Sequence, residues 1–294
     1  MDIIRRNCPI CDATNDTVYC QSNIDYAKLD EYAFASRKYP ECMRHRLMHC
    51  PTCDVVYADP APTQKLLQQE YEAALFDSSE EARCAAHTYA SYLPKGLKFG
   101  KALDIGTGGG EFLSELCNYG FSSVEGIEPS PAAITTADPS IKPYIRQGVF
   151  VPEQYLPETY AFISCFQTLE HVADPLMLSR ACYKALVPGG VYFIVSHNIS
   201  GGINRLLGTR SPIFDIEHLQ LFSPQSITKL MKKSGFEQVQ LFPIWNRYPL
   251  HYWVKLLPLP KAFTRQIIRL LKAMKIGYIK IPMNVGNIGV MAFK

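Results

Sequence analysis

A short apolar run that leads directly into a cluster of glycines constrains the fold of this chain more than any other feature. Residues 101–113 read Lys-Ala-Leu-Asp-Ile-Gly-Thr-Gly-Gly-Gly-Glu-Phe-Leu, and apolar residues at helical spacing follow the glycines. The pattern predicts a strand, a glycine-rich turn and a helix. Glycine adopts positive φ readily, and without a Cβ it lets a ligand approach the backbone N–H groups. We therefore expect a ligand-binding turn here.

The residues around this turn restrict the class of ligand. A phosphate-binding loop would close with Gly-Lys-Ser or Gly-Lys-Thr, whereas Glu111 and Phe112 follow Gly110. A second predicted strand, residues 122–127, leads into Glu128, and a carboxylate at that place can accept hydrogen bonds from both hydroxyls of a ribose. The ligand is thus expected to contain a ribose. The alternative is a glycine-rich turn that lies beside an incidental acid.

The spacing of the glycines resembles a known cofactor motif. Gly106-x-Gly108-x-Gly110, preceded by Asp104, is similar to the motif of class I S-adenosylmethionine-dependent methyltransferases and differs from the Gly-x-Gly-x-x-Gly of NAD sites. Further segments resemble successive motifs of small-molecule methyltransferases of the ubiquinone-biosynthesis type: Glu-Pro-Ser at 128–130, Leu-Glu-His-Val at 169–172, Leu-Val-Pro-Gly-Gly at 186–190, and a segment that begins at Ser223 and closes at Gly235-Phe236.

The resemblance implies a fold, an activity and a cofactor. The fold is an α/β, Rossmann-like, doubly wound seven-stranded sheet, and residues 288–293 should form its antiparallel strand. Alternation of apolar strands with helical segments predicts the same fold class independently. The implied activity is methyl transfer from S-adenosyl-L-methionine. Ligands of such folds bind beyond the carboxyl ends of the strands. The expected cofactor-binding residues are Asp104, Gly106, Gly108, Gly110, Glu128, Pro129, Val149, Phe150, Gln167, Thr168 and His171.

Two Cys-x-x-Cys pairs near the N-terminus predict a metal site. Cys8, Cys11, Cys50 and Cys53 supply four thiolates, the tetrahedral set that a structural zinc ion requires. A redox pair and unligated cysteines are the alternatives. The pairs and residues 55–60 together resemble the N-terminal zinc module found on a subset of these methyltransferases, including sugar C-methyltransferases. A closed site of four thiolates would have no catalytic role.

The chain divides into three predicted parts. We expect a zinc-ribbon-like module at 1–60, a helical linker at 61–98 and the cofactor-binding domain at 99–294. Between the cysteine pairs the sequence is rich in Tyr, Arg and Lys, which indicates an inserted loop or hairpin, or a flap over the substrate. Other predicted elements are a helix from Thr63 to about Tyr92 with a polar interruption at 77–81, strands at 143–146, 160–166 and 191–196, and a helix at 176–186.

The methyl acceptor is predicted mainly by motifs that the chain lacks. The fourth strand is not followed by the Asn/Asp-Pro-Pro-Tyr/Phe typical of base amino-group methylation, and no Pro-Cys pair suits pyrimidine methylation. Cys165 is interpreted as a core residue. An oxygen or carbon of a small molecule remains. We expect His218 to act as the general base, with His197 second, although either ring could instead be structural.

Charge and composition restrict the partners and the compartment. The net charge is only +3 and 19% of the residues are charged, so nucleic acid is not expected as a partner. An RNA methyltransferase and a non-catalytic cofactor-binding scaffold remain as alternative functions. No secretory signal or spanning segment is visible, which predicts a cytoplasmic protein whose cysteines are thiols or metal ligands.

The C-terminal part is strongly basic, since no acid follows Glu237. Residues 261–275 have the spacing of an amphipathic helix with a cationic face. A solvated helix that covers the sheet is the plain interpretation. The alternatives are attraction to an anionic small molecule such as a nucleotide-linked sugar, to an acyl carrier protein, or to an anionic membrane surface.

Overall fold

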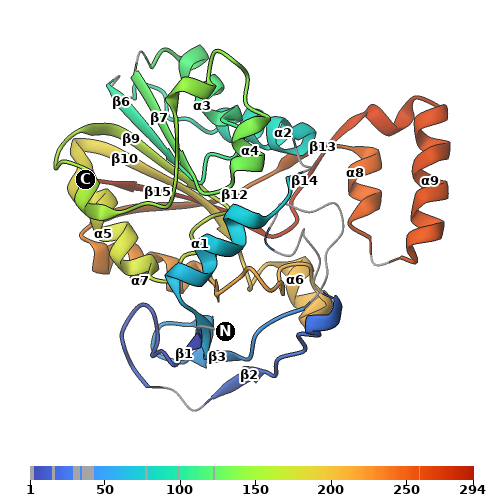
Figure 1. Ribbon diagram of the computed structural model, residues 1–294, viewed down its shortest axis with the longest axis horizontal. Coiled ribbons are helices and arrows are strands. Elements are labelled where there is room, and N and C mark those ends of the chain that lie inside the picture. The colour runs from blue at the N-terminus through green and yellow to red at the C-terminus, as the bar shows by residue number, and fades with distance from the viewer. Residues whose placement is uncertain are drawn as a thin grey trace.

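A seven-stranded, mostly parallel sheet forms the centre of the computed structural model, which describes residues 3–14, 17–28, 34, 43–76, 79–97, 100–121, 123–257 and 259–294 (Figure 1). The strand order is β12-β15-β10-β9-β6-β7-β8. β15 runs antiparallel to both of its neighbours, as expected for residues 288–293. The strands are β6 (Lys101–Ile105), β7 (Ser123–Glu128), β8 (Ile145–Gln147), β9 (Tyr160–Phe166), β10 (Leu186–His197), β12 (Gln238–Pro243) and β15 (Asn287–Phe293).

Helices cover both faces of this sheet, because alternate residues of its buried strands face opposite sides. Phe162 of β9 packs in one core cluster with residues of α2 and α3, whereas Ile163 packs in the other with residues of α5 and α7. The predicted α/β, Rossmann-like fold is confirmed. The helices are α1 (Gln64–Ala73), α2 (Ser79–Ala90), α3 (Glu111–Tyr119), α4 (Pro131–Thr135), α5 (Pro175–Ala185), α6 (Gly202–Leu207), α7 (Pro224–Ser234), α8 (Leu250–Lys255) and α9 (Lys261–Ala273).

Cys165 has no exposed surface, which confirms its interpretation as a core residue. Within the described ranges, no helix has the length and apolar character needed to cross a bilayer.

Short elements complete the described chain. The 3-10 turns are η1 (Tyr26–Lys28), η2 (Lys142–Tyr144), η3 (Pro152–Gln154), η4 (Gly208–Arg210) and η5 (Ile276–Tyr278). The small strand pairs are β1 (Ile3–Ile4) with β5 (Ala61–Pro62) and β13 (Asn246–Pro249) with β14 (Lys280–Met283).

Two predicted strand boundaries were wrong. The strand expected at 143–146 is β8 at Ile145–Gln147, because Pro143 lies in η2 and cannot donate to a ladder. The strand expected at 191–196 begins at Leu186. A bulge between Leu186 and Val191 accommodates the Pro-Gly-Gly segment, with Gly189 at φ 77°.

The polar interruption predicted at 77–81 was also placed wrongly. Helix α2 begins at Ser79, so Glu80 and Glu81 form its first turn, where acidic side chains interact favourably with the helix dipole. Three predicted features fall at least partly outside the described residues: positions 77 and 78, Ser122 at the predicted start of the second strand, and part of the basic, Tyr-rich segment between the cysteine pairs (29–33 and 35–42).

The cysteine-containing segment forms a second sheet that also includes a strand from late in the chain. Its order is β11-β4-β3-β2, in which β11 (Gln220–Leu221) pairs with β4 (Val55–Ala58), and β4 with β3 (Leu47–Cys50); β2 is Val18–Cys20. Cys8, Cys50 and Cys53 belong to the same core cluster as Phe222. The sheet and the core thus cross the predicted boundary at residue 60.

Candidate functional site

The glycine turn after β6 forms a cradle whose backbone excludes side chains. Gly106, Gly108 and Gly110 have φ values of 74°, 59° and 78°, in the left-handed region. A Cβ on Gly106 would collide with the side chain of Thr168. A Cβ on Gly110 would lie 2.7 Å from Ile141, so glycine at that position is required by packing at the start of α3. Of the three glycines, Gly108 alone leaves room for a Cβ.

Two buried carboxyl groups support the cradle. Asp104 accepts a hydrogen bond of 2.6 Å from the Ser164 hydroxyl, and burial raises its pKa to about 7. Glu128 accepts 2.9 Å hydrogen bonds from the backbone N–H groups of Gly108 and Ser130. Burial raises the pKa of Glu128, while these N–H groups oppose that rise. Glu128 thus joins the glycine turn to the start of α4.

A single cavity of about 1090 Å³ contains most of the predicted site residues. This volume is at the upper limit of typical small-molecule sites, about 300–1,000 Å³, so it can hold a cofactor together with an acceptor. Apolar side chains of α1, α2 and α8 also line the cavity. Gly110 is not among the lining residues. The predicted residues that line the cavity are Asp104, Gly106, Gly108, Glu128, Pro129, Val149, Phe150, Gln167, Thr168, His171, His197 and His218.

The turn after β9 is strained where it borders the cavity. Gln167 has φ 49°, a conformation that is unusual for a residue with a side chain, and its N–H donates to the carbonyl of Val195 at 2.7 Å. Thr168, which follows, packs against Gly106. Strain of this kind concentrates at binding sites.

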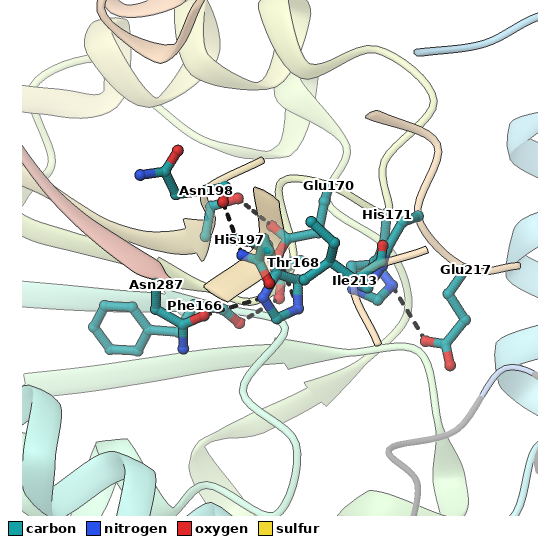
Figure 2. Close-up of polar contacts among 12 residues, drawn as sticks. Phe166, Thr168, Glu170, His171, His197, Asn198, Ile213, Glu217 and Asn287 are labelled. Carbon is teal, nitrogen blue, oxygen red and sulfur yellow. Dashed lines mark hydrogen bonds and ion pairs between the residues drawn. The ribbon is translucent and has the colours of Figure 1, made fainter. Parts of the chain in front are cut away.

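Three histidines from separate segments meet at the wall of this cavity. Figure 2 labels two of them, His171 and His197. The ring of His218 lies 4.9 Å from the ring of His171 and 4.9 Å from the ring of His197, measured between centroids. His197 is the last residue of β10, His171 lies in the loop after β9, and His218 precedes β11. The topology therefore brings together residues far apart in the sequence.

A hydrogen bond fixes the tautomer of His218, and polar groups lie near both ring nitrogens of His197. The Nδ1–H of His218 donates to the carbonyl of Ile213 at 2.7 Å, so Nε2 is its basic nitrogen. Nδ1 of His197 lies 3.1 Å from Oδ1 of Asn287, and its Nε2 lies 3.9 Å from Oε1 of Glu170. Burial lowers the pKa of His197, so its neutral form is favoured.

His171 has a different environment from the other two rings. Its Nδ1 lies 3.2 Å from Oε2 of Glu217 and 2.8 Å from the hydroxyl of Tyr71 on α1 (Figure 2 shows the Glu217 contact). Burial acts against protonation of this ring, but the hydrogen bond and charge of Glu217 outweigh it and raise the pKa of His171.

Sequence reasoning missed Glu170, Glu217 and Tyr71 as members of the site. The carboxylate of Glu170 is fully buried and accepts a hydrogen bond of 2.9 Å from the Ser196 hydroxyl. Glu170 stands in the quoted Leu-Glu-His-Val motif, so a signal for it was present. For Tyr71 there was none, because its contact joins α1 to a loop a hundred residues later.

Arg6 and Gln220 connect the histidine-bearing loops to the cysteine sheet. The guanidinium of Arg6 donates to the carbonyls of Ala58, Ala173 and Leu219. The side-chain amide of Gln220 donates to the carbonyls of Leu169 and Val172 at 2.8 and 2.9 Å. These contacts hold the His171 loop and the His218 loop against β4.

Two groups of side chains within the described residues could hold a metal ion. The ligand atoms of Cys8, Cys11, Cys50 and Cys53 all lie within 4.8 Å of one another. The sulfurs of Cys11 and Cys50 are 3.6 Å apart, close to the ~3.8 Å expected for two thiolates bound tetrahedrally at ~2.3 Å from zinc. The second group is Glu170, His197 and His218.

Comparison with known proteins identifies the family. A family model described as a methyltransferase domain matches residues 68–241, more than half of the chain. The chain belongs to this methyltransferase family. Together with the relatives and structures below, the match confirms the expected class I S-adenosylmethionine-dependent methyltransferase.

Curated relatives of this methyltransferase share part of their length with it. It is 27% identical over 156 residues to the ubiquinone biosynthesis O-methyltransferase of Aliivibrio fischeri (strain MJ11), a match that covers 49% of this chain and 66% of the relative. It is 35% identical over 112 residues to the protein of that name from Pseudomonas syringae pv. syringae (strain B728a), which covers 35% and 47%. The chain thus spans less than two thirds of the length of these relatives.

Solved structures with low identity share the fold of this methyltransferase. A SAM-dependent methyltransferase from Archaeoglobus fulgidus superimposes with a TM-score of 0.51 at 17% identity, over 79% of this chain and 100% of that chain. A Haloferax volcanii methyltransferase, solved in complex with the Trm112 methyltransferase activator, gives 0.50 at 16% identity, over 74% and 91%. At these identities the likeness concerns the fold alone.

The cradle of this methyltransferase fits the cofactor of its family. Gly106 and Gly108 line the cavity, Gly108 has room where a Cβ would lie, and Glu128 borders the same cavity. When bound, S-adenosylmethionine supplies an activated methyl group on a sulfonium. The residues of the chain then have to hold the cofactor, align an acceptor and accept a proton.

Proposed function

We propose that this methyltransferase transfers the methyl group to an oxygen or carbon of a small-molecule metabolite, with His218 as the general base and His197 as the second candidate. One observation carries the proposal. The glycine cradle and the three histidines border the same cavity, which has room for two ligands. A cofactor held at one end would direct its methyl group toward an acceptor placed at the histidines.

The cofactor would be held by the residues predicted from the motif. Glu128 would accept the ribose hydroxyls, and Val149 and Phe150 would pack against the adenine ring. Phe150 stacks on Tyr155 with ring centroids 4.4 Å apart, which supports a firm adenine wall. Asp104 would act through the backbone of the turn that it supports.

The state of the histidines suits proton removal. Because Nδ1–H of His218 is held by a carbonyl, its Nε2 is the nitrogen that would take the proton. His197 lies beside it in the neutral form, and Glu170 behind His197 would stabilise a positive charge that forms on the cluster. Relatives named as O-methyltransferases favour oxygen over carbon as the acceptor atom.

We further propose that Cys8, Cys11, Cys50 and Cys53 hold a structural zinc ion. Their spacing fits a tetrahedral site. All four ligand positions would be filled by thiolates, so the ion would serve the fold and not the chemistry. The residues 1–60 would then form a module that the later chain completes through β11.

A pair of histidine variants tests the assignment of His218 as the general base. His218→Gln should lower turnover by roughly 10²-fold or more while binding of S-adenosylhomocysteine is retained. His251→Gln is the matched control, since His251 is also buried with Nδ1 held by a carbonyl, that of Gly277, but lies outside the cavity lining. Undiminished turnover of the His218 variant would exclude it as the base.

The acceptor can be found by incubating cell extract with isotopically labelled cofactor and identifying the labelled metabolite. Label in a small molecule supports the proposal. Label in RNA, with binding that weakens steeply with salt, would favour the RNA methyltransferase alternative. Cofactor binding without label in any fraction would favour a scaffold.

A further inference from the structure

Helices α8 and α9, with the 3-10 turn that follows, form an arm inserted between the last two strands of the central sheet. The arm comprises residues 250–279. In Figure 1, α8 and α9 lie side by side at one edge of the molecule, away from the central sheet. The main contacts of α9 are with α8 and with η5. The plain interpretation of this helix as a cover for the sheet therefore does not describe its position.

Helix α9 exposes an apolar row to solvent. Phe263, Leu270 and Met274 are 54%, 62% and 57% exposed. At about 100° per residue, spacings of seven and four positions place the three side chains within roughly 20° of one face. Thr264 is buried, which shows that the helix packs on α8 through a different face. The apolar row thus has no role in holding the arm together.

A row of cations lies along the exposed surface of α9, on the margin away from the apolar row. Arg265, Arg269 and Lys272 are exposed and lie about 180–240° around the helix from Phe263. The exposed residues between the two rows are small or polar: Ala262, Gln266 and Ala273. One side of α9 therefore presents apolar side chains along one margin and cations along the other.

We propose that the arm docks on an anionic lipid surface through this side of α9. An interfacial helix inserts Phe and Leu side chains at the boundary of the acyl chains and places Lys and Arg among the headgroups. The apolar row and the cationic row of α9 lie on one exposed side, so both contacts can form at the same time. A second copy of the chain fits poorly, since no acid follows Glu237 and arm-to-arm contact would bring cations together.

Vesicle flotation of the full chain tests the proposal. The protein should float with phosphatidylcholine vesicles that contain phosphatidylglycerol, in a salt-sensitive manner, and should not float with phosphatidylcholine alone. Arg269→Gln with Lys272→Gln should weaken partitioning about 25-fold, since each cation near the surface contributes about fivefold. Phe263→Ser with Leu270→Ser should weaken it by at least about tenfold.

Controls separate the arm from general surface properties. Leu156→Ser removes an exposed leucine elsewhere, and Lys232→Gln with Lys233→Gln removes two cations from α7; both should float like the wild type. All variants should bind S-adenosylhomocysteine as the wild type does, which verifies folding. Arm variants that float normally, or a wild type that ignores anionic vesicles, would overturn the proposal, as would arm-dependent capture of an acidic carrier protein without flotation.

Discussion

Replacing Asp104 by Asn should make the protein more resistant to unfolding above neutral pH. Burial raises the pKa of Asp104 from 3.8 to about 7 in the folded protein, although the Ser164 hydrogen bond opposes this shift. The folded state therefore holds the proton more tightly than the unfolded state. By linkage, the free energy of unfolding falls by ~1.4 kcal/mol per pH unit as the pH rises from about 4 to about 7. Between about pH 5.5 and pH 8, the titration of Asp104 lowers the unfolding free energy of the wild type by about 2 kcal/mol.

Asn has the same shape and does not titrate, so the variant lacks this loss. Equilibrium urea denaturation of both proteins at the two pH values gives the difference in unfolding free energy, variant minus wild type. This difference should be about 2 kcal/mol more positive at the higher pH. Taking the difference cancels the titration of all other groups. Asp138→Asn, at an exposed carboxylate whose pKa is lowered by hydrogen bonds from Ser140, should show no such trend in this range. A pH-independent difference for Asp104→Asn would refute the reasoning.

Two further predictions concern the cofactor and the metal. Glu128→Gln should weaken binding of S-adenosylhomocysteine by about tenfold or more in calorimetry, because a charged hydrogen-bond acceptor is lost. Glu125→Gln, on the same strand but outside the cavity lining, should not. Equal affinities for these two variants would contradict the ribose assignment. Cys53→Ser should remove zinc from protein purified without added metal and lower the unfolding free energy by at least about 3 kcal/mol, whereas Cys117→Ser, at an exposed cysteine, should retain the metal. A metal-free wild type that is folded would exclude the zinc site.

The cradle could be predicted from sequence because its determinants are local. Gly106 and Gly108 adopt positive φ within the turn that their own sequence forms, and Glu128 ends the adjacent strand. The contacts between loops could not be predicted in this way. Glu217 pairs with His171, and Arg6 binds the carbonyl of Leu219, only because the fold brings these segments together.

Segment boundaries failed where glycine or proline allowed more than one outcome. Pro188-Gly189-Gly190 reads as the end of a helix followed by a break. In the structure this segment is a bulge whose Gly189 N–H donates to the carbonyl of Lys294 at 2.8 Å. The partner lies at the far end of the chain, so no local pattern could indicate that the strand continues through the bulge.

If the four cysteines hold the proposed zinc ion, the pairing of β11 with β4 couples that ion to the segment that carries the proposed base, His218. Strand β11 begins two residues after His218, and the N–H of Ala58 in β4 donates to the carbonyl of Leu219 at 2.8 Å. Oxidants or chelators that disturb the cysteine sheet would displace the His218 loop, whereas the turn after β6 lies in the other sheet. Such treatment should therefore lower turnover more than it lowers cofactor affinity.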